Sequence, residues 1–172
     1  MKRLFLLRHA KSSAGDPGQD DHARPLNGRG RRAAEAIGEL LASRGDAPEL
    51  ALCSSAKRTR ETLELVLEQL DVPPRIEILR DLYLASSETL LERVRELPEG
   101  VASALLVGHN PGIGELALRL ATRGSADARK SLREKFPTAA LAILRLEGAW
   151  ANATRGAELE DFVLPRELEG VR

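Results

Sequence analysis

Short apolar runs recur along the chain, and polar or amphipathic stretches separate them. Runs of this length between turn-forming residues are typical of buried strands. The pattern therefore predicts five buried strands, and a shorter apolar run near the end of the chain adds a sixth. The five runs lie at residues 4–7, 50–53, 76–79, 104–107 and 141–146, and the sixth at 162–164.

Amphipathic segments fill the intervals between these runs. Their apolar side chains recur at spacings of three and four, which is the period of a helix with one buried face. Asn27 precedes the first segment and Asn110 the last, and asparagine is a favoured cap at a helix start. Pro111 then occupies the first position of the last helix. The helices are predicted at residues 28–43, 57–70, 88–95 and 111–121.

The alternation of strands and helices predicts an α/β fold of three layers. Helices would cover both faces of an open, mostly parallel sheet of about six strands. The 172-residue chain is 42% hydrophobic, which is typical of one globular domain over residues 1–172. Because such sheets bind ligands at the carboxyl ends of their strands, the loops that follow the strands are expected to determine function.

Charge, cysteine content and hydropathy narrow the class of protein. Lys plus Arg and Asp plus Glu both number 26, so the chain has no formal net charge and no basic run typical of nucleic-acid binders. The single cysteine, Cys53, fits a reducing cytoplasm. The apolar start at residues 4–7 is too short for an export signal, and no run is long enough for a membrane helix. We therefore expect a cytoplasmic protein without a nucleic-acid or membrane partner.

Three of the predicted strands end in residues that can bind an anion. Arg8 and His9 follow the first strand, Ser54 to Arg58 follow the second, and His109 follows the fourth. Parallel strands bring such ends to one edge of a sheet. Guanidinium groups supply forked donors for a tetrahedral oxyanion, and a helix N-terminus adds backbone N–H groups. The sequence therefore predicts a phosphate site at this edge.

Several motifs resemble the histidine phosphatase (phosphoglycerate mutase-like) superfamily, and most closely its SixA-type phosphohistidine phosphatases. The ordered motifs cover nearly the whole chain. They are Leu6-Leu7-Arg8-His9-Ala10-Lys11-Ser12, Arg24-Pro25-Leu26 with Gly30, Ser54 with Arg58 and Thr62, Val107-Gly108-His109-Asn110-Pro111, Phe136-Pro137-Thr138-Ala139-Ala140 and Phe162-Val163-Leu164-Pro165-Arg166.

The resemblance implies a phosphoglycerate mutase-like fold and a phosphatase that forms a phosphohistidine intermediate. His9 would be the nucleophile, and Arg8, Arg58 and His109 would stabilise the phosphoryl oxygens. Asn110 and its backbone surroundings would also contact phosphate. Neither a cofactor nor a metal ion is expected.

Two features of the predicted site depart from the family pattern. Many members carry Asn six residues after the nucleophile, where this chain has Gly15, so Ser12 is a candidate replacement donor. Many also have a Glu or Asp after the third strand that protonates the leaving group. Asp81 is the candidate for that acid here. The lack of a motif around it favours a phosphohistidine substrate, because imidazole can be protonated near neutral pH whereas an alkoxide needs an acid.

Residue spacing argues against two other interpretations, a cysteine phosphatase loop and a metal site. Cys53 is not followed by Arg at the spacing of a cysteine phosphatase loop, and it is expected to be a buried strand residue. His22 beside Asp20 and Asp21 lacks a second histidine at a metal-ligand spacing. Trp150 is expected to pack in the core.

The sequence is compatible with more than one class of substrate or ligand. The expected partner is a phosphorylated protein that carries phosphohistidine, because only a short helix fits between the third and fourth strands and leaves no lid. The alternatives are a phosphatase for a small phosphate ester, such as a sugar or nucleotide phosphate, and a phosphate-binding module without turnover. A module of that kind would need cations but no nucleophile such as His9.

Overall fold

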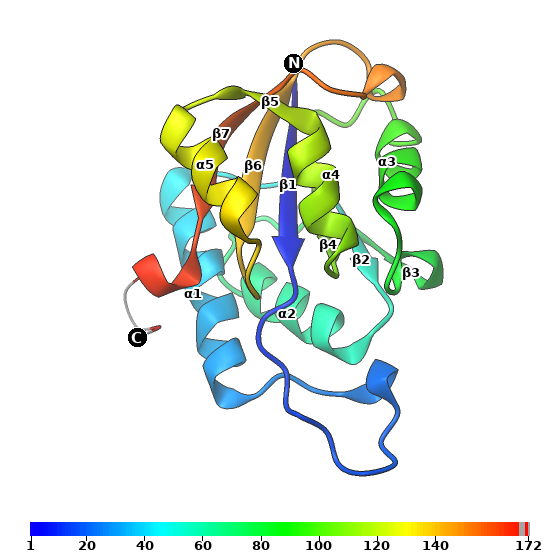
Figure 1. The fold of residues 1–172 in the computed structure, drawn as a ribbon, viewed down its shortest axis with the longest axis vertical. Coiled ribbons are helices and arrows are strands. Elements are labelled where there is room, and N and C mark those ends of the chain that lie inside the picture. The colour runs from blue at the N-terminus through cyan, green and yellow to red at the C-terminus, as the bar shows by residue number, and fades with distance from the viewer. Residues whose placement is uncertain (169–170, 172) are drawn as a thin grey trace.

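Seven strands form one sheet in the computed structural model, which describes residues 1–168 and 171. The strand order is β3-β2-β4-β1-β6-β7-β5 (Figure 1). Most neighbouring strands are parallel, but β6 is antiparallel to both of its neighbours. The strands are β1 Lys2–Arg8, β2 Leu50–Ser54, β3 Arg75–Leu79, β4 Ser103–Gly108, β5 Ala121–Gly124, β6 Leu141–Leu146 and β7 Ala157–Val163.

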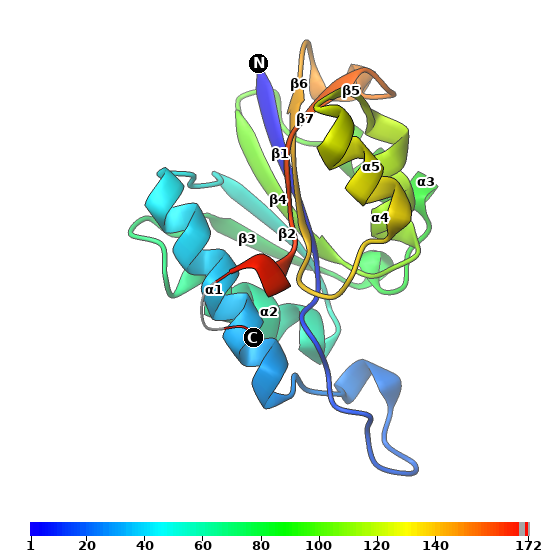
Figure 2. The ribbon, with the colours of Figure 1, turned by 60° about the vertical axis from the view of Figure 1, so that its left-hand side comes forward.

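Helices cover both faces of the sheet, so the predicted three-layer α/β architecture is confirmed. Figures 1 and 2 show α1 and α2 on one face and α3, α4 and α5 on the other. The helices are α1 Gly28–Arg44, α2 Lys57–Leu67, α3 Ser87–Arg95, α4 Gly112–Leu120 and α5 Ala126–Glu134, with short 3-10 turns η1 Asp21–Ala23, η2 Arg80–Leu82, η3 Trp150–Asn152 and η4 Pro165–Glu167. Among the described residues, no helix combines the length and hydropathy of a membrane span.

The central strand β1 shows how the apolar pattern builds two cores. Leu4 and Leu6 pack into the cluster beneath α3 and α4, whereas Phe5 and Leu7 pack into the cluster beneath α1 and α2. Successive side chains of a strand point to opposite faces, so a strand that is covered on both sides is apolar throughout. This explains why the first predicted strand was a continuous run and not an alternating one.

The structure departs from the sequence prediction at the sheet edges. β3 was predicted as a buried strand, but Ile76 and Ile78 are each 46% exposed because β3 has only one neighbouring strand. β5 and α5 were not predicted, since their residues are mostly polar and lack a clear apolar period. β5 raises the number of strands from about six to seven.

The sheet order places the carboxyl ends of β1, β2 and β4 beside one another. β2, β4 and β1 are consecutive and parallel, and Arg8 is in register with Gly108. The residues that follow these strands therefore meet at one edge. Between β3 and β4 the chain forms only η2, α3 and their connecting loops, so this connection adds no large insertion at the edge (Figure 1).

Candidate active site

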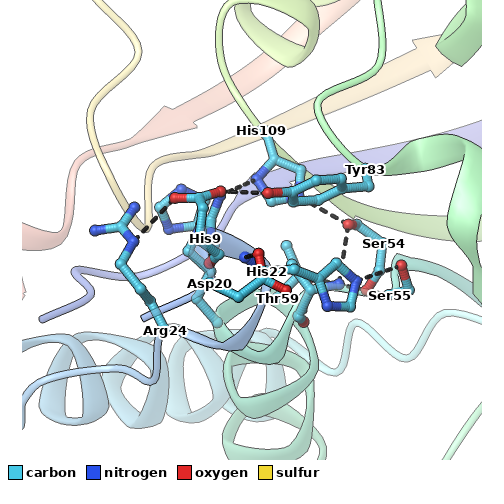
Figure 3. A network of polar contacts seen from close by, with 12 residues as sticks. His9, Asp20, His22, Arg24, Ser54, Ser55, Thr59, Tyr83 and His109 are labelled. Carbon is cyan, nitrogen blue, oxygen red and sulfur yellow. Dashed lines mark hydrogen bonds and ion pairs between the residues drawn. The ribbon is translucent and has the colours of Figure 1, made fainter. Parts of the chain in front are cut away.

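A pocket of about 430 Å³ lies at the carboxyl ends of β1, β2 and β4. Figure 3 shows His9, His109 and Tyr83 gathered at this end of the sheet. We call Arg8, His9, Arg58 and His109 the floor of the pocket, and Asp21, Tyr83 and Leu84 its rim. The pocket is lined by Arg8, His9, Lys11, Ser12, Asp21, Arg24, Arg58, Leu84, His109, Asn110 and Thr138.

His9 directly follows β1, and its backbone N–H donates to the carbonyl of Gly108. Its Nδ1 lies 2.7 Å from the carbonyl oxygen of Ala10. A carbonyl can only accept, so Nδ1 carries the proton and Nε2 keeps a lone pair. Burial lowers the pKa of His9 from 6.5 to about 4, and the positive charges of Arg58 and Arg8 act in the same direction. His9 is therefore a neutral imidazole near pH 7.

His109 directly follows β4 and is only 2% exposed. Its Nε2 lies 2.7 Å from the hydroxyl of Ser54, and its Nδ1 lies 3.4 Å from a terminal nitrogen of Arg58. Because a guanidinium can only donate, Nδ1 accepts and Nε2 donates to Ser54. Burial lowers the pKa of His109 to about 3, and the adjacent His9 contributes to the shift. Both imidazoles of the floor are thus neutral, with their ring centres 5.3 Å apart.

The two arginines of the floor supply buried positive charge. Arg58, on the first turn of α2, is 3% exposed, and one terminal nitrogen of Arg8 donates to the carbonyl of Phe136. Burial lowers the pKa of Arg8, and the charge of Arg58 lowers it further. The Nε atoms of both arginines are buried without a hydrogen-bond partner among the described residues. Both arginines line the pocket, so they bring positive charge to an oxyanion that binds there.

Close packing holds the segment after His9 in place. The backbone N–H of Ala10 donates to the hydroxyl of Thr62 over 2.9 Å, and that hydroxyl donates to the carbonyl of Arg58. On the other side, a Cβ added at Gly30 would lie 2.0 Å from the carbonyl oxygen of Lys11. Only glycine permits α1 to approach the backbone this closely. Thr62 and Gly30 therefore support the position of His9.

The rim has a different character, because its polar groups are partly exposed. The carboxylate of Asp21, on η1, accepts from Arg58 over 3.1 Å, from Arg24 over 3.0 Å and from the hydroxyl of Tyr83. The hydrogen bond from Tyr83 lowers the pKa of Asp21 to about 2, helped by the bonds from the two arginines. Burial raises the pKa of Tyr83, and its hydrogen bond to Asp21 adds to this. Asp21 is therefore ionised across the physiological range.

A family model described as the histidine phosphatase superfamily (branch 1) matches residues 4–144. The chain belongs to the histidine phosphatase superfamily. It is therefore a phosphatase of the class that uses a histidine nucleophile. The fold that the sequence resemblance implied is also confirmed.

Several members of the superfamily are similar over most of this chain. The Mycobacterium tuberculosis (strain H37Rv) protein Rv1276c is 40% identical over 163 residues, which cover 93% of this chain and 100% of that protein. The phosphohistidine phosphatase SixA of Escherichia coli K12 is 30% identical over 120 residues, which cover 69% of this chain and 73% of that protein.

Solved structures of the superfamily align along nearly the whole chain. The provisionally named phosphohistidine phosphatase SixA of Nakamurella multipartitia has a TM-score of 0.82 and 32% identity, covering 95% of this chain and 96% of that one. A provisionally named alpha-ribazole-5'-P phosphatase of E. coli has a TM-score of 0.69 and 19% identity, covering 96% and 98%, and shares the fold alone.

The structure brings most of the predicted site residues together. All four floor residues line one pocket, and Ser12 and Asn110 line it as well. The side-chain amide of Asn110 is already used, because it donates to Phe136 and accepts from Gly114. Its helix begins at Gly112, one residue later than predicted, with Pro111 at the cap position.

Asp81, the candidate acid, is not brought into the pocket. Its carboxylate accepts two hydrogen bonds from Arg93 on α3, over 2.5 and 2.8 Å, and Asp81 is absent from the lining of the pocket. The carboxylate is thereby engaged with a neighbouring helix. Asp21 is the carboxylate that lines the pocket among the described residues, and its low pKa makes it a poor proton donor.

The sequence did not identify the rim residues Asp21, Tyr83 and Leu84 as part of the site. In the sequence, Asp21 stands out only as a neighbour of His22 in a rejected metal site, and Tyr83 belongs to none of the motifs. One signal was present, since Tyr83 is the only tyrosine of the chain and follows the third predicted strand by four residues. Within the described residues, no cluster of three His, Cys, Asp or Glu side chains could hold a metal ion.

Two structural predictions near these motifs are confirmed. Cys53 is fully buried on β2, and burial raises the pKa of its thiol to about 12, so it stays protonated. Trp150 is fully buried, and its indole N–H donates to the carbonyl of Val101.

Proposed function

We propose that this chain hydrolyses phosphohistidine on a protein, with His9 as the nucleophile. The observation that carries the substrate class is the ionised state of Asp21. It is the carboxylate among the described pocket-lining residues, and its pKa of about 2 leaves it without a proton to give. A substrate whose leaving group needs no acid fits such a pocket best. The leaving imidazole of phosphohistidine meets this condition, because it can be protonated near neutral pH.

The first step transfers the phosphoryl group to the enzyme. The lone pair on Nε2 of His9 attacks phosphorus as the P–N bond to the substrate imidazole breaks. The electron pair of that bond leaves with the substrate imidazole, which already carries a proton on its other nitrogen and departs neutral. Arg8 and Arg58 line the pocket, and their guanidinium groups stabilise the negative charge on the phosphoryl oxygens.

The second step releases phosphate. Water attacks the phosphorus of phosphorylated His9, the new P–N bond breaks, and its electron pair returns to Nε2. One proton of the water passes to a phosphoryl oxygen, so the product leaves as inorganic phosphate and His9 is again neutral. The hydrogen bond from Nδ1 to Ala10 keeps the ring in one orientation and tautomer through both steps. His109 is neutral in the empty pocket, and a bound dianion would raise its pKa by supplying the opposite charge.

A protein substrate is supported by the exposed rim. Between β3 and β4 the chain adds only η2 and α3, so the pocket opens outward beside Tyr83 and Leu84. Leu84 is 54% exposed and holds a φ of +50°, an uncommon conformation for a leucine. The exposed mouth of the pocket leaves room for a side chain carried by a partner protein. The similarity to SixA of E. coli points in the same direction.

The test compares two peptides that differ only in the leaving group. One carries phosphohistidine and the other phosphoserine at the same position of the same sequence. Because a general acid contributes about 10² to 10⁴ in rate, kcat/KM should be at least about 100-fold higher for phosphohistidine. Equal values, or a preference for phosphoserine, would contradict the proposed substrate class.

A further inference from the structure

A second pocket, of about 340 Å³, adjoins the catalytic one. Lys11 and Thr138 line both, so the two pockets are continuous at these residues. The second pocket lies between the N-terminal half of α1, the loop before β6, and η4. Figure 2 shows η4 lying beside α1, so segments distant in sequence form its walls.

Four cationic side chains gather around this second pocket. They come from four separate segments, and no carboxylate lies among the described residues that line it. None of the four forms an ion pair with the part of the chain that the structure describes. They are Lys11, Arg29, Lys135 and Arg166.

Two arginines near this cluster form ion pairs, unlike the four cationic residues that line the second pocket. Arg31, two residues after Arg29 on α1, bonds to Glu61, and Arg24 bonds to Asp21. The whole chain has no formal net charge. Clustered cations in a neutral protein raise the local potential and attract anions. The second pocket is therefore a local site of positive potential beside the phosphate pocket.

Apart from Thr138, the rest of the lining is apolar. Ala33, Pro137, Leu164 and Val171 contribute to the walls, and each carries only an aliphatic side chain. A carboxylate on a short aliphatic stem matches a pocket with apolar walls and a cationic rim. Acidic side chains of a polypeptide have this form.

We propose that the second pocket binds an acidic side chain of the substrate protein, close in space to its phosphohistidine. The inference rests on the proposed function, because it assigns the occupant to the same substrate. The catalytic pocket would then select the phosphorylated histidine, and the cationic pocket would select among proteins that carry one. Charged groups of this kind act mainly on specificity and on the encounter with the partner.

The experiment uses phosphohistidine peptides in which one Asp is moved through successive positions on either side of the phosphohistidine. Each is compared with the same peptide carrying Asn. At one or more positions, Asp should lower KM by about fivefold, the range expected for a few partly exposed charge pairs. Added salt should reduce the difference.

The test variant combines Arg29→Glu, Lys135→Glu and Arg166→Glu. All three side chains are exposed and line only the second pocket, so kcat for the Asn peptides should stay unchanged. The preference for Asp should disappear or reverse. The matched control, Arg75→Glu with Lys130→Glu and Arg155→Glu, changes net charge equally at exposed positions outside both pockets and should keep the preference.

Each contrary outcome has a distinct meaning. Turnover of the Asn peptides with no effect of Asp at any position would overturn this inference and leave the proposed function standing. Loss of the preference in the control variant as well would overturn it too, because net charge and not the pocket would then be responsible. No turnover of any phosphohistidine peptide would overturn the proposed function itself.

Discussion

The floor and the rim of the pocket lie in contact, but they differ in solvent exposure and in the elements that carry their residues. Arg58 of the floor has a side chain that is 3% exposed, whereas its partner Asp21 on the rim is 46% exposed. The floor residues follow strands or begin a helix, and the rim residues lie on η1 and in the loop after β3. Buried groups on rigid elements are suited to chemistry, and exposed groups on loops are suited to recognition.

The first prediction compares a histidine of the floor with a histidine outside the pocket. His9→Ala should reduce turnover by about 10⁴-fold or more, because it removes the proposed nucleophile that forms the covalent intermediate. His22→Ala is the matched control, since His22 lies beside Tyr83 and bonds to Ser55 but does not line the pocket. It should stay within about tenfold of the parent protein. Far-UV circular dichroism would show that both variants fold, and comparable losses in both would erase the distinction.

The second prediction concerns acid stability. The pKa of His9 and that of His109 are lowered from 6.5 to about 4 and about 3, so the unfolded chain binds protons that the folded chain does not. Their contribution is complete above 6.5 and is lost as pH falls toward those values. Asp21, with a pKa of about 2, keeps its own contribution until more acid conditions. As pH falls, the free energy of unfolding should therefore lose the contribution of the floor histidines before that of Asp21.

Urea unfolding followed between about pH 6.5 and about pH 4 measures this effect. The free energy of unfolding should fall with pH across the interval, and it should fall less steeply in His109→Gln, which removes one of the two groups. A free energy that is independent of pH across the interval would mean that the histidines are not held neutral by burial.

The third prediction compares Asp81, the acid that the sequence favoured, with Asp21, which the structure places in the pocket. Asp21→Asn should lower kcat/KM by about tenfold, since the amide keeps the size of the side chain but loses the ionic bond that orients Arg58. Asp81→Asn should change it by less than about twofold for phosphohistidine and phosphoserine peptides alike, because Asp81 pairs with Arg93 away from the pocket. A selective loss on phosphoserine in Asp81→Asn would restore it as the acid.

The same division explains what could be predicted from the sequence. His9 and His109 were found because each directly follows a buried apolar run, and parallel strands must bring such ends together. Asp21 and Tyr83 meet only through the folding of two loops, which no periodicity encodes. β3 was identified as a strand but not as an edge, since its apolar residues resemble those of a buried strand while its exposure depends on sheet order.

The central claim is that His9 carries the phosphoryl group during turnover, and trapping that intermediate tests it most directly. Rapid quenching after mixing with a phosphohistidine peptide should yield one phosphate per chain, mapped to His9 by mass spectrometry. Because the linkage is a P–N bond, the adduct should survive alkali and be lost in acid. An acid-stable adduct, or one on another residue that persists in His9→Ala, would contradict the account.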